Sequence, residues 1–302
     1  INNYFSAYYS HPSWIVKRWI SRYGNDFTEQ LLIANNDKPK LMLRVNNLKT
    51  NYNEFENLLK KVNLKYSKGK YAPDFVRLHN LVNITDWEYF TKGYFSVQDE
   101  STALPVYLLD VKPGMKVLDL CAAPGGKTGL LADRMKNEGE IVALDKYESR
   151  IKILKKNLER LGVQNVRTEV TDALEFNEEG FDRVLIDAPC SGLGTLTKKP
   201  DIKWKRDIGD FRKITPIQSS LLNKGAELLK PNGFLVYSTC TIEPEENYEI
   251  IKQFLFEHPD FELVSGHGIF DDDILDSNGC VQTFPNIHGT DGAFAAKLLK
   301  KK

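Results

Sequence analysis

The sequence predicts an α/β protein in which a parallel sheet, covered by helices on both faces, follows a smaller α/β module. Three observations predict this fold. The 302 residues, 41% of them hydrophobic, can bury the core of one catalytic domain plus a small module. Beyond Gln98, strand-like runs alternate with helical stretches, as in βαβ crossovers. Polar residues gather directly after those runs, where open parallel sheets bind their ligands.

We expect three segments along the chain: a helical lead-in over residues 1–40, a small α/β module over residues 41–98, and a catalytic domain over residues 99–302. Apolar residues recur at helical spacing in the aromatic and basic stretch His11–Ile20, which predicts a helix there. No repeat or low-complexity linker separates the module from the domain. The two should therefore pack rigidly against each other.

Short apolar runs mark the expected strands. In the module these are Leu41–Val45 and a strand near Phe75–Leu78, with a helical pattern between them at Asn53–Val62. The domain continues with five β-rich runs, most of them separated by helical stretches, which indicates a parallel sheet covered on both faces. These five runs are Lys116–Leu120, Glu140–Leu144, Val166–Val170, Arg183–Ile186 and Phe234–Tyr237.

Charge is unevenly distributed, although the formal net charge is zero. Residues 1–96 carry 14 Lys and Arg against 8 Asp and Glu, whereas the remainder carries 27 against 33. The front part therefore suits a polyanion, but modestly basic modules are common in other proteins too. The four cysteines form no CxxC pair and no disulfide framework, which favours a reduced, cytoplasmic protein. No signal peptide or transmembrane run is present, and Ile at position 1 predicts a trimmed N-terminus.

The first expected strand of the domain runs into a loop of small residues, Cys121–Lys127, and then directly into a helix. Small residues let a ligand approach the backbone, and a helix N-terminus offers free amides to an anionic group. The loop has neither the GxGxxG nor the GxxxxGK[ST] spacing, which favours a nucleoside ligand over a dinucleotide or a nucleoside triphosphate. Asp119, Asp145 and Asp172 close three successive strands; Asp145 suits ribose hydroxyls and Asp172 a place near an adenine, although each also suits a helix cap.

Two further strands end in cysteines. Asp187 and Cys190 follow the fourth strand in the segment DAPCSG, and Cys240 follows the fifth in YSTC. A single cysteine in such a place is more often a small buried apolar residue than a nucleophile. Two thiols and a carboxylate at one rim of a sheet indicate a reacting centre instead. Spacing alone does not rank the two thiols.

These motifs carry a family resemblance. The segments DLCAAPGGKT, DAPCSG and YSTC resemble the signature set of the RNA cytosine-C5 methyltransferases. HPSWIVKRW, LRVNNLK, QDESTALP and KPDIKW extend the resemblance over nearly the whole chain, closest to the branch that acts on bacterial small-subunit (16S) rRNA. Members of that branch usually carry a further N-terminal helical domain resembling the antitermination factor NusB. The present sequence has no counterpart for it, which predicts a fragment or a shorter relative.

The resemblance implies a Rossmann-like class I methyltransferase sheet, mostly parallel with an antiparallel last strand that Ala293–Leu299 can supply. It also implies an N-terminal RNA-binding module and the cofactor S-adenosyl-L-methionine. Cys240 is then the nucleophile and Cys190 assists product release, while Asp187 faces the target base at the cofactor. Asp145 is expected on the ribose and Asp172 near the adenine. The loop implied to hold the methionine end of the cofactor is Cys121, Ala122, Ala123, Pro124, Gly125, Gly126 and Lys127.

The implied partner is rRNA, with tRNA methylation, DNA methylation and a non-catalytic ribosome-assembly factor as alternatives. The TC motif of Cys240 disfavours DNA, and the presence of both thiols disfavours a non-catalytic factor. We expect no metal site, because the five histidines lack ligand spacing, no membrane partner, and a monomer. Cys280 is expected to be structural. Basic residues that suit RNA phosphates, but equally suit a solvated surface, are Lys17, Arg18, Arg44, Lys198, Lys199, Lys203, Lys205 and Arg206, the last five flanking Trp204.

Overall fold

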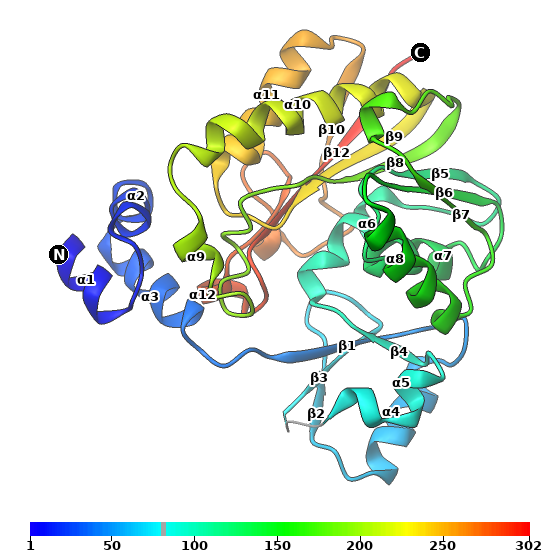
Figure 1. The fold of residues 1–302 in the computed structure, drawn as a ribbon, viewed down its shortest axis with the longest axis horizontal. Helices are drawn as coiled ribbons and strands as arrows, with labels where there is room; N and C mark the ends of the chain where they lie inside the picture. Colours follow the sequence, from blue (N-terminus) through cyan, green and yellow to red (C-terminus); the bar gives the residue numbers. More distant parts are fainter. Residues whose placement is uncertain (80–82) are drawn as a thin grey trace.

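The computed structural model describes residues 1–79 and 83–302 and confirms the predicted α/β class (Figure 1). Its large sheet has the strand order β10-β12-β9-β8-β5-β6-β7, with β11 paired to β12. The strands are β5 (Lys116–Asp119), β6 (Glu140–Asp145), β7 (Val166–Val170), β8 (Phe181–Asp187), β9 (Leu229–Thr239), β10 (Phe261–Val264), β11 (Val281–Thr283) and β12 (Ala293–Lys300).

The middle of this sheet is parallel, and one edge is antiparallel. Strands β7, β6, β5, β8 and β9 run in parallel, as the five apolar runs predicted. Strand β12 pairs antiparallel with β9, from Phe294 opposite Thr239 to Leu299 opposite Phe234. The antiparallel last strand expected at Ala293–Leu299 is therefore confirmed. Because parallel strands share one carboxyl edge, the residues after β5, β8 and β9 lie on the same rim of the sheet.

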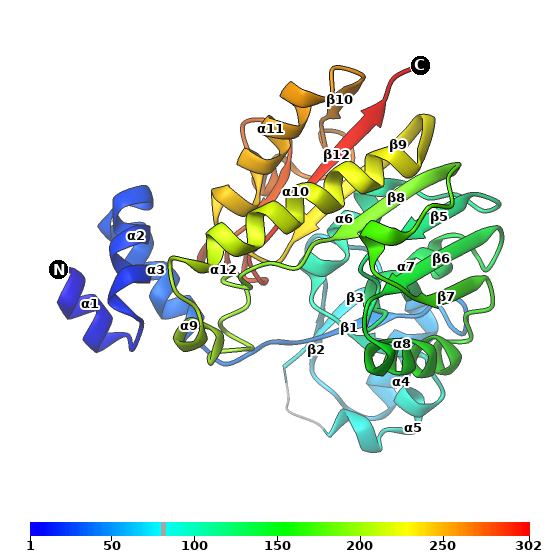
Figure 2. The ribbon, with the colours of Figure 1, turned by 45° about the horizontal axis from the view of Figure 1, so that its top comes forward.

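Helices cover both faces of the large sheet (Figure 2). Alternate residues of β6 point to opposite faces. Val142 belongs to the core cluster that includes residues of α10 (Asp210–Leu228) and α11 (Tyr248–Glu257), whereas Ile141 belongs to the cluster that includes residues of α6 (Leu104–Leu109) and α7 (Gly126–Arg134). Helix α8 (Glu148–Leu161) contacts β6 and β7. Both faces are thus buried, as a parallel sheet requires.

The small module is a four-stranded antiparallel sheet in the order β2-β3-β1-β4. Strands β1 (Leu41–Val45) and β3 (Phe75–Leu78) lie where the sequence predicted them. The helix expected at Asn53–Val62 begins one residue earlier, as α4 (Tyr52–Lys61), because the side chain of Asn51 caps it by accepting a hydrogen bond from the Glu54 amide. The remaining elements are β2 (Tyr66–Lys68), β4 (Phe95–Val97) and α5 (Glu88–Thr91).

The lead-in folds into helices α1 (Asn2–Tyr8), α2 (Ser13–Tyr23) and α3 (Asn25–Asn35). In Figure 1 they lie beside α9 (Ile202–Lys205) and α12 (Pro285–His288), away from the small sheet. Their core residues, such as Trp19, cluster with Leu193 and Phe211 of the large part of the molecule. The lead-in therefore packs on the sheet domain, and the boundaries at residues 40 and 98 stay predictions.

The sequence did not reveal the shortest elements. Strands β2, β4, β10 and β11 have only three or four residues each, too few to display a clear alternation. The same holds for the 3-10 helices at Ile84–Asp86, Glu100–Thr102, Ala173–Glu175, Pro244–Glu246 and Asp272–Ile274. Among the described residues, no helix is long and apolar enough to cross a membrane.

Candidate active site

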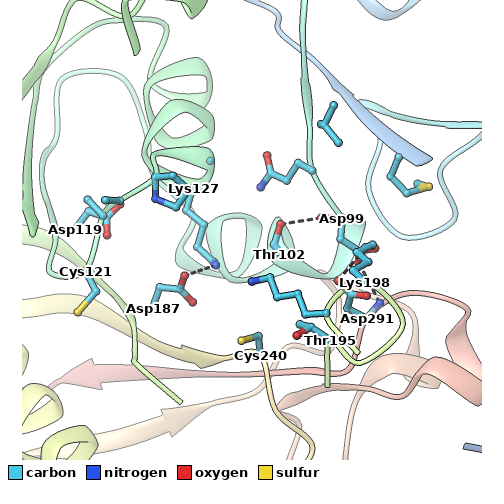
Figure 3. A pocket seen from close by; sticks show the side chains of 18 of the residues that line it. Asp99, Thr102, Asp119, Cys121, Lys127, Asp187, Thr195, Lys198, Cys240 and Asp291 are labelled. Atoms are coloured by element: carbon cyan, nitrogen blue, oxygen red, sulfur yellow. Dashed lines mark hydrogen bonds and ion pairs between the residues drawn. The ribbon is translucent and has the colours of Figure 1, made fainter. Parts of the chain in front are cut away.

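A cavity of about 410 Å³ opens at the carboxyl edge of β5, β8 and β9, on the side that faces the small module. The loop after β5 forms one wall, Val97 and Gln98 at the end of the small sheet form another, and segments around Lys198 and Asp291 close it. Figure 3 shows Cys240 between the Lys127 and Asp187 pair on one side and the group of Asp99, Lys198 and Asp291 on the other. The cavity thus has two ends with different chemistry.

The loop Cys121–Lys127, which was predicted to hold the methionine end of the cofactor, forms one end of the cavity. Among its residues, Gly125 alone stands back from the lining. With φ of +103° it turns the chain into α7 and packs against Leu154, where a Cβ would come within 2.6 Å of the Leu154 side chain. Only glycine fits both the backbone angle and the space. The N-terminus of α7 consequently points into the cavity, where its free amides are available to an anionic ligand group.

Asp119, at the end of β5, is buried beneath this loop. Its Oδ2 accepts a hydrogen bond from Thr128 Oγ1 at 2.8 Å, whereas Oδ1 has no partner in the part of the chain that the structure describes. Burial raises the pKa of Asp119 to about 7, although the Thr128 hydrogen bond acts in the opposite direction. A buried carboxylate oxygen that lacks a donor, in the cavity lining, fits the ammonium group of an amino acid such as the methionine end of S-adenosylmethionine. No motif in the sequence indicated a specific role for Asp119.

Asp145 and Asp172 lie outside the cavity lining. Asp145 is buried at the end of β6, where Oδ2 pairs with Arg150 at 3.0 Å and Oδ1 accepts from the Tyr147 amide. Asp172 pairs with Lys146 at 2.8 Å and caps the short helix that follows β7. Both positions stay predictions for cofactor contacts.

Asp187 ends β8 and faces the cavity. Its Oδ2 lies 2.6 Å from Lys127 Nζ, and its Oδ1 accepts a weaker hydrogen bond from Ser238 Oγ at 3.3 Å. Burial lowers the pKa of Lys127, but the charge and the hydrogen bond of Asp187 raise it, and the net shift is upward. Lys127 therefore remains a cation. The structure thus brings two predicted residues from different loops into one ion pair beside Cys240 (Figure 3).

The two predicted thiols meet. Cys190 Sγ lies 3.2 Å from Cys240 Sγ and also accepts a hydrogen bond from the Cys240 amide at 3.4 Å. Cys240 lines the cavity, and both thiols are free. The hydrogen bond between the two thiols lowers the pKa of Cys240, helped by the charges of Lys127 and Lys199 and opposed by burial. That same contact, together with burial and the charge of Glu246, raises the pKa of Cys190.

The far end of the cavity holds a charged group that the sequence did not indicate. Lys198 lies between two buried carboxylates, in contact with Asp99 and 2.9 Å from Asp291 Oδ2. Burial and Asp99 raise the pKa of Asp291 to about 6, against the effect of Lys198. The three residues are widely separated in sequence, so no local motif marks them. Lys198 was predicted as an RNA contact, but its ammonium is engaged in this group.

The basic residues that were predicted to contact RNA therefore fall into two groups, those that are buried or paired within the protein and those that are exposed. Arg44 is wholly buried, hydrogen-bonded to Gln98 at 2.7 Å and 3.5 Å from Asp133, so its expected contact with RNA is wrong. This burial depends on contacts with Gln98 and with Asp133 of α7, which the periodicity of the sequence does not reveal. Lys203 is also buried, although Trp204 beside it is 62% exposed. Arg18 pairs with Glu243 and Glu245, and Arg206 donates to the backbone oxygens of Ser191 and Cys190. The residues that remain exposed are Lys17, Lys199, Trp204 and Lys205.

The other cysteines fit the roles expected of them. Cys121 contributes to the cavity lining, and burial raises the pKa of its thiol far above the ordinary range. Cys280 is buried in the core, and burial raises its pKa in the same way. Both thiols are therefore poor nucleophiles. In residues 1–79 and 83–302, no group of three or more His, Cys, Asp or Glu side chains is arranged to hold a metal ion.

Two family models match the chain. The model of the 16S rRNA methyltransferase RsmB/F matches residues 106–299, which include all of the large sheet except the last residue of β12. A model of the ferredoxin-like domain of RsmF/B-like methyltransferases matches residues 11–85, which include α2, α3 and three strands of the small sheet. Neither model covers residues 86–105, which include the cavity residues Val97, Gln98, Asp99 and Thr102.

Individual relatives agree with these matches. The probable ribosomal RNA small subunit methyltransferase B of Bacillus subtilis (strain 168) is 39% identical over 299 residues, a match that covers 97% of this chain and 67% of the relative. The ribosomal RNA small subunit methyltransferase B of Photorhabdus laumondii is 38% identical, covering 98% of this chain and 68% of the relative. Among solved structures, a methyltransferase homologue from Pyrococcus horikoshii has a TM-score of 0.85 at 33% identity and covers 98% of this chain and 97% of its own.

Proposed function

The chain belongs to the 16S rRNA methyltransferase RsmB/F family and is an S-adenosylmethionine-dependent RNA methyltransferase, and from this premise we propose that it methylates C5 of a cytosine in small-subunit rRNA with Cys240 as the nucleophile. One observation carries the proposal: a thiol with a lowered pKa lines the cavity, 3.2 Å from a second thiol and beside the Lys127 and Asp187 pair. Methylation of an acceptor that is already nucleophilic, such as a ribose hydroxyl, does not require activation by a thiol.

The chemistry of cytosine explains the need for Cys240. C5 of the aromatic ring is too electron-poor to take a methyl group directly. When the Cys240 thiolate adds to C6, the S–C6 bond forms and the C5–C6 π electron pair shifts to C5, where it is delocalised through C4 onto N3; C5 thereby becomes nucleophilic. When bound, S-adenosylmethionine supplies the electrophilic methyl group, and the loop Cys121–Lys127 with Asp119 fits its methionine end.

The remaining side chains then stabilise charge and move protons. Asp187 faces the cavity and can accept hydrogen bonds from the exocyclic amine of the base, held in place by Lys127. Removal of the C5 proton, by Cys190 or by a water molecule, allows the S–C6 bond to break, and its electron pair returns to Cys240. The short distance between the two sulfur atoms supports this division of labour.

We also propose that the small module and the exposed residues near Trp204 bind RNA around the target. Trp204 is 62% exposed on α9, which suits stacking on an unpaired base, and Lys199 lines the cavity mouth. A target base has to leave its stack to reach Cys240, which costs least in a loop or a distorted helix.

The test is methylation by the purified chain with radiolabelled S-adenosylmethionine on small-subunit rRNA, tRNA and duplex DNA, followed by nucleoside analysis. Labelled 5-methylcytidine from rRNA is the expected result. Label at another atom would overturn the C5 proposal, and label in tRNA alone would overturn the proposed substrate. If the chain binds the cofactor but labels none of the three nucleic acids, the result favours the alternative of a non-catalytic ribosome-assembly factor.

A further inference from the structure

The short segment Pro244–Glu246 and the next residue, Asn247, make hydrogen bonds to both loops that carry the thiols. Glu246 is wholly buried. Its Oε1 accepts hydrogen bonds from the Ser191 amide at 2.7 Å and from Gln218 Nε2 at 3.1 Å, and its Oε2 accepts one from Ser191 Oγ at 2.5 Å. Ser191 follows Cys190 directly, and Gln218 also donates to the oxygen of Pro189, directly before Cys190. The carboxylate therefore fixes the Cys190 loop on both sides of the thiol.

Asn247 fixes the Cys240 loop in a similar way. Its Oδ1 accepts a hydrogen bond from Thr239 Oγ1 at 2.5 Å, and its Nδ2 donates to the oxygen of Thr241 at 3.0 Å. Thr239 and Thr241 are the neighbours of Cys240. The loops are also linked to each other, because Ser191 Oγ lies 2.9 Å from Thr241 Oγ1. Two adjacent residues thus hold both strand ends that carry the thiols.

The two thiols have different polar and charged neighbours. Glu246 and the phenol of Tyr237 face Cys190, with Arg206 on its backbone oxygen, whereas Lys127 and Lys199 act on Cys240 and Asp187 opposes them. Burial raises the pKa of Glu246 above its usual value, and hydrogen bonds from Ser191, Gln218 and Thr241 reduce the size of that shift. These hydrogen bonds favour the ionised carboxylate. Its negative charge therefore opposes a thiolate at Cys190 more than at Cys240.

We propose that Glu246 and Asn247 are positioning residues that hold the two sulfur atoms together and keep the shared proton on Cys190, so that Cys240 is the sulfur that attacks. This inference rests on the proposed function. Before attack, the Cys190 thiol donates its proton in a hydrogen bond to the Cys240 thiolate. During attack, the Cys240 electron pair forms the S–C6 bond, and the proton stays on Cys190. Cys190 then has to release this proton to solvent before its thiolate can accept the C5 proton; otherwise a water molecule accepts it.

The experiment measures alkylation by iodoacetamide at each thiol of the full chain, without RNA or cofactor, by mass spectrometry of the peptides. Because only thiolates react appreciably, the ratio of the rates at Cys240 and Cys190 reports where the proton resides at about pH 7.5. The pH dependence of each rate, measured between about pH 6 and pH 10, separates ionisation from accessibility, because a thiol's rate follows its thiolate fraction as the pH rises. Cys280 serves as a buried internal reference.

Glu246→Gln is the decisive variant, because an amide keeps the acceptor for the Ser191 amide and removes the charge. We expect the Cys240 to Cys190 ratio at neutral pH to fall about tenfold, the effect of about one pKa unit. Glu249→Gln changes an exposed glutamate on α11 and should leave the ratio unchanged. Ser191→Ala keeps the charge of Glu246 and should therefore largely preserve the ratio of the two alkylation rates.

An unchanged ratio in folded Glu246→Gln, checked by circular dichroism, overturns the inference. If that variant does not fold, the wild-type chain still decides, because preferential alkylation of Cys190 at neutral pH contradicts the proposed proton position. The outcome is independent of the proposed function, since alkylation requires no RNA. Methylation of RNA by a Cys240→Ser variant would instead contradict the proposed function. It would not change the alkylation ratio measured in the wild-type chain.

Discussion

The proposed cofactor side and the thiol side of the active site are built in opposite ways. The cofactor side, Asp119 and Cys121–Lys127, is one continuous stretch that ends a strand and starts a helix, and much of what it offers a ligand is backbone. The thiol side, Cys190 and Cys240 with Glu246 and Asn247 beneath them, comes from three loops and works through side chains. Substitutions on the cofactor side should therefore change binding in graded steps, whereas those on the thiol side should stop the reaction.

The largest effect is expected for Cys240→Ser. A serine hydroxyl ionises far less readily than a thiol, so single-turnover methylation of rRNA should fall by about 10³-fold or more. Cys190→Ser should instead accumulate a covalent adduct with RNA, visible as a protein band of reduced mobility in denaturing gels. Cys280→Ala, in the core, is the matched control and should methylate at the wild-type rate. An adduct in Cys240→Ser and none in Cys190→Ser would reverse the roles of the two thiols.

Asp187→Asn tests the residue that pairs with Lys127 of the proposed cofactor side and lies beside Cys240 of the thiol side. The amide loses the charge that pairs with Lys127 and an acceptor for the base, so turnover should fall by about 10²- to 10³-fold. Affinity for S-adenosylhomocysteine, measured by calorimetry, should stay within about threefold, since the cofactor side consists largely of backbone. Wild-type turnover in this variant would remove the assignment of Asp187 to the reacting centre.

Asp119→Asn should act on binding alone. The ionised Asp119 carboxylate is expected to pair with the ammonium group of the cofactor, so its loss should weaken S-adenosylhomocysteine binding by about 10- to 100-fold. Because the pKa of Asp119 is raised to about 7, affinity of the wild-type chain should decrease as the pH falls below 7. Calorimetry at several pH values should show this dependence in the wild type and not in the variant.

The same pKa makes a separate prediction for stability. In the unfolded chain an aspartate ionises near pH 3.9, so burial of the protonated form favours the fold below that pH. This contribution is lost as the pH rises through about 7 in the folded chain without cofactor. The free energy of unfolding of the wild type should therefore decrease relative to Asp119→Asn between these two pH values. A constant difference would contradict the raised pKa.

The smallest effect is expected outside the cavity. Trp204→Ala should weaken RNA binding by about tenfold, the loss of one stacked base, with cofactor affinity unchanged. Phe256→Ala removes an aromatic side chain that is 84% exposed on α11 and serves as the control. Filter binding at fixed salt measures both. Equal RNA affinities for the two variants would place the RNA path elsewhere.

The sequence by itself determined the fold class, the five parallel strands and the loop Cys121–Lys127, because each depends on neighbours within one strand or turn. It also placed Asp187, Cys190 and Cys240 on one rim, since parallel strands share a carboxyl edge. The resemblance to a methyltransferase family added what spacing alone did not contain, namely the ranking of the two thiols and the antiparallel last strand.

The tertiary structure decided everything that depends on contacts between distant segments. It buried Arg44 against Asp133, although both the charge of Arg44 and its place in a basic module suggested a surface. It enclosed Lys198 between Asp99 and Asp291, and it placed Glu246 under the Cys190 loop, 55 residues away. Burial and charge pairing are set by which loops meet at the sheet edge, and periodicity along one strand or helix carries no information about its partner across the cavity.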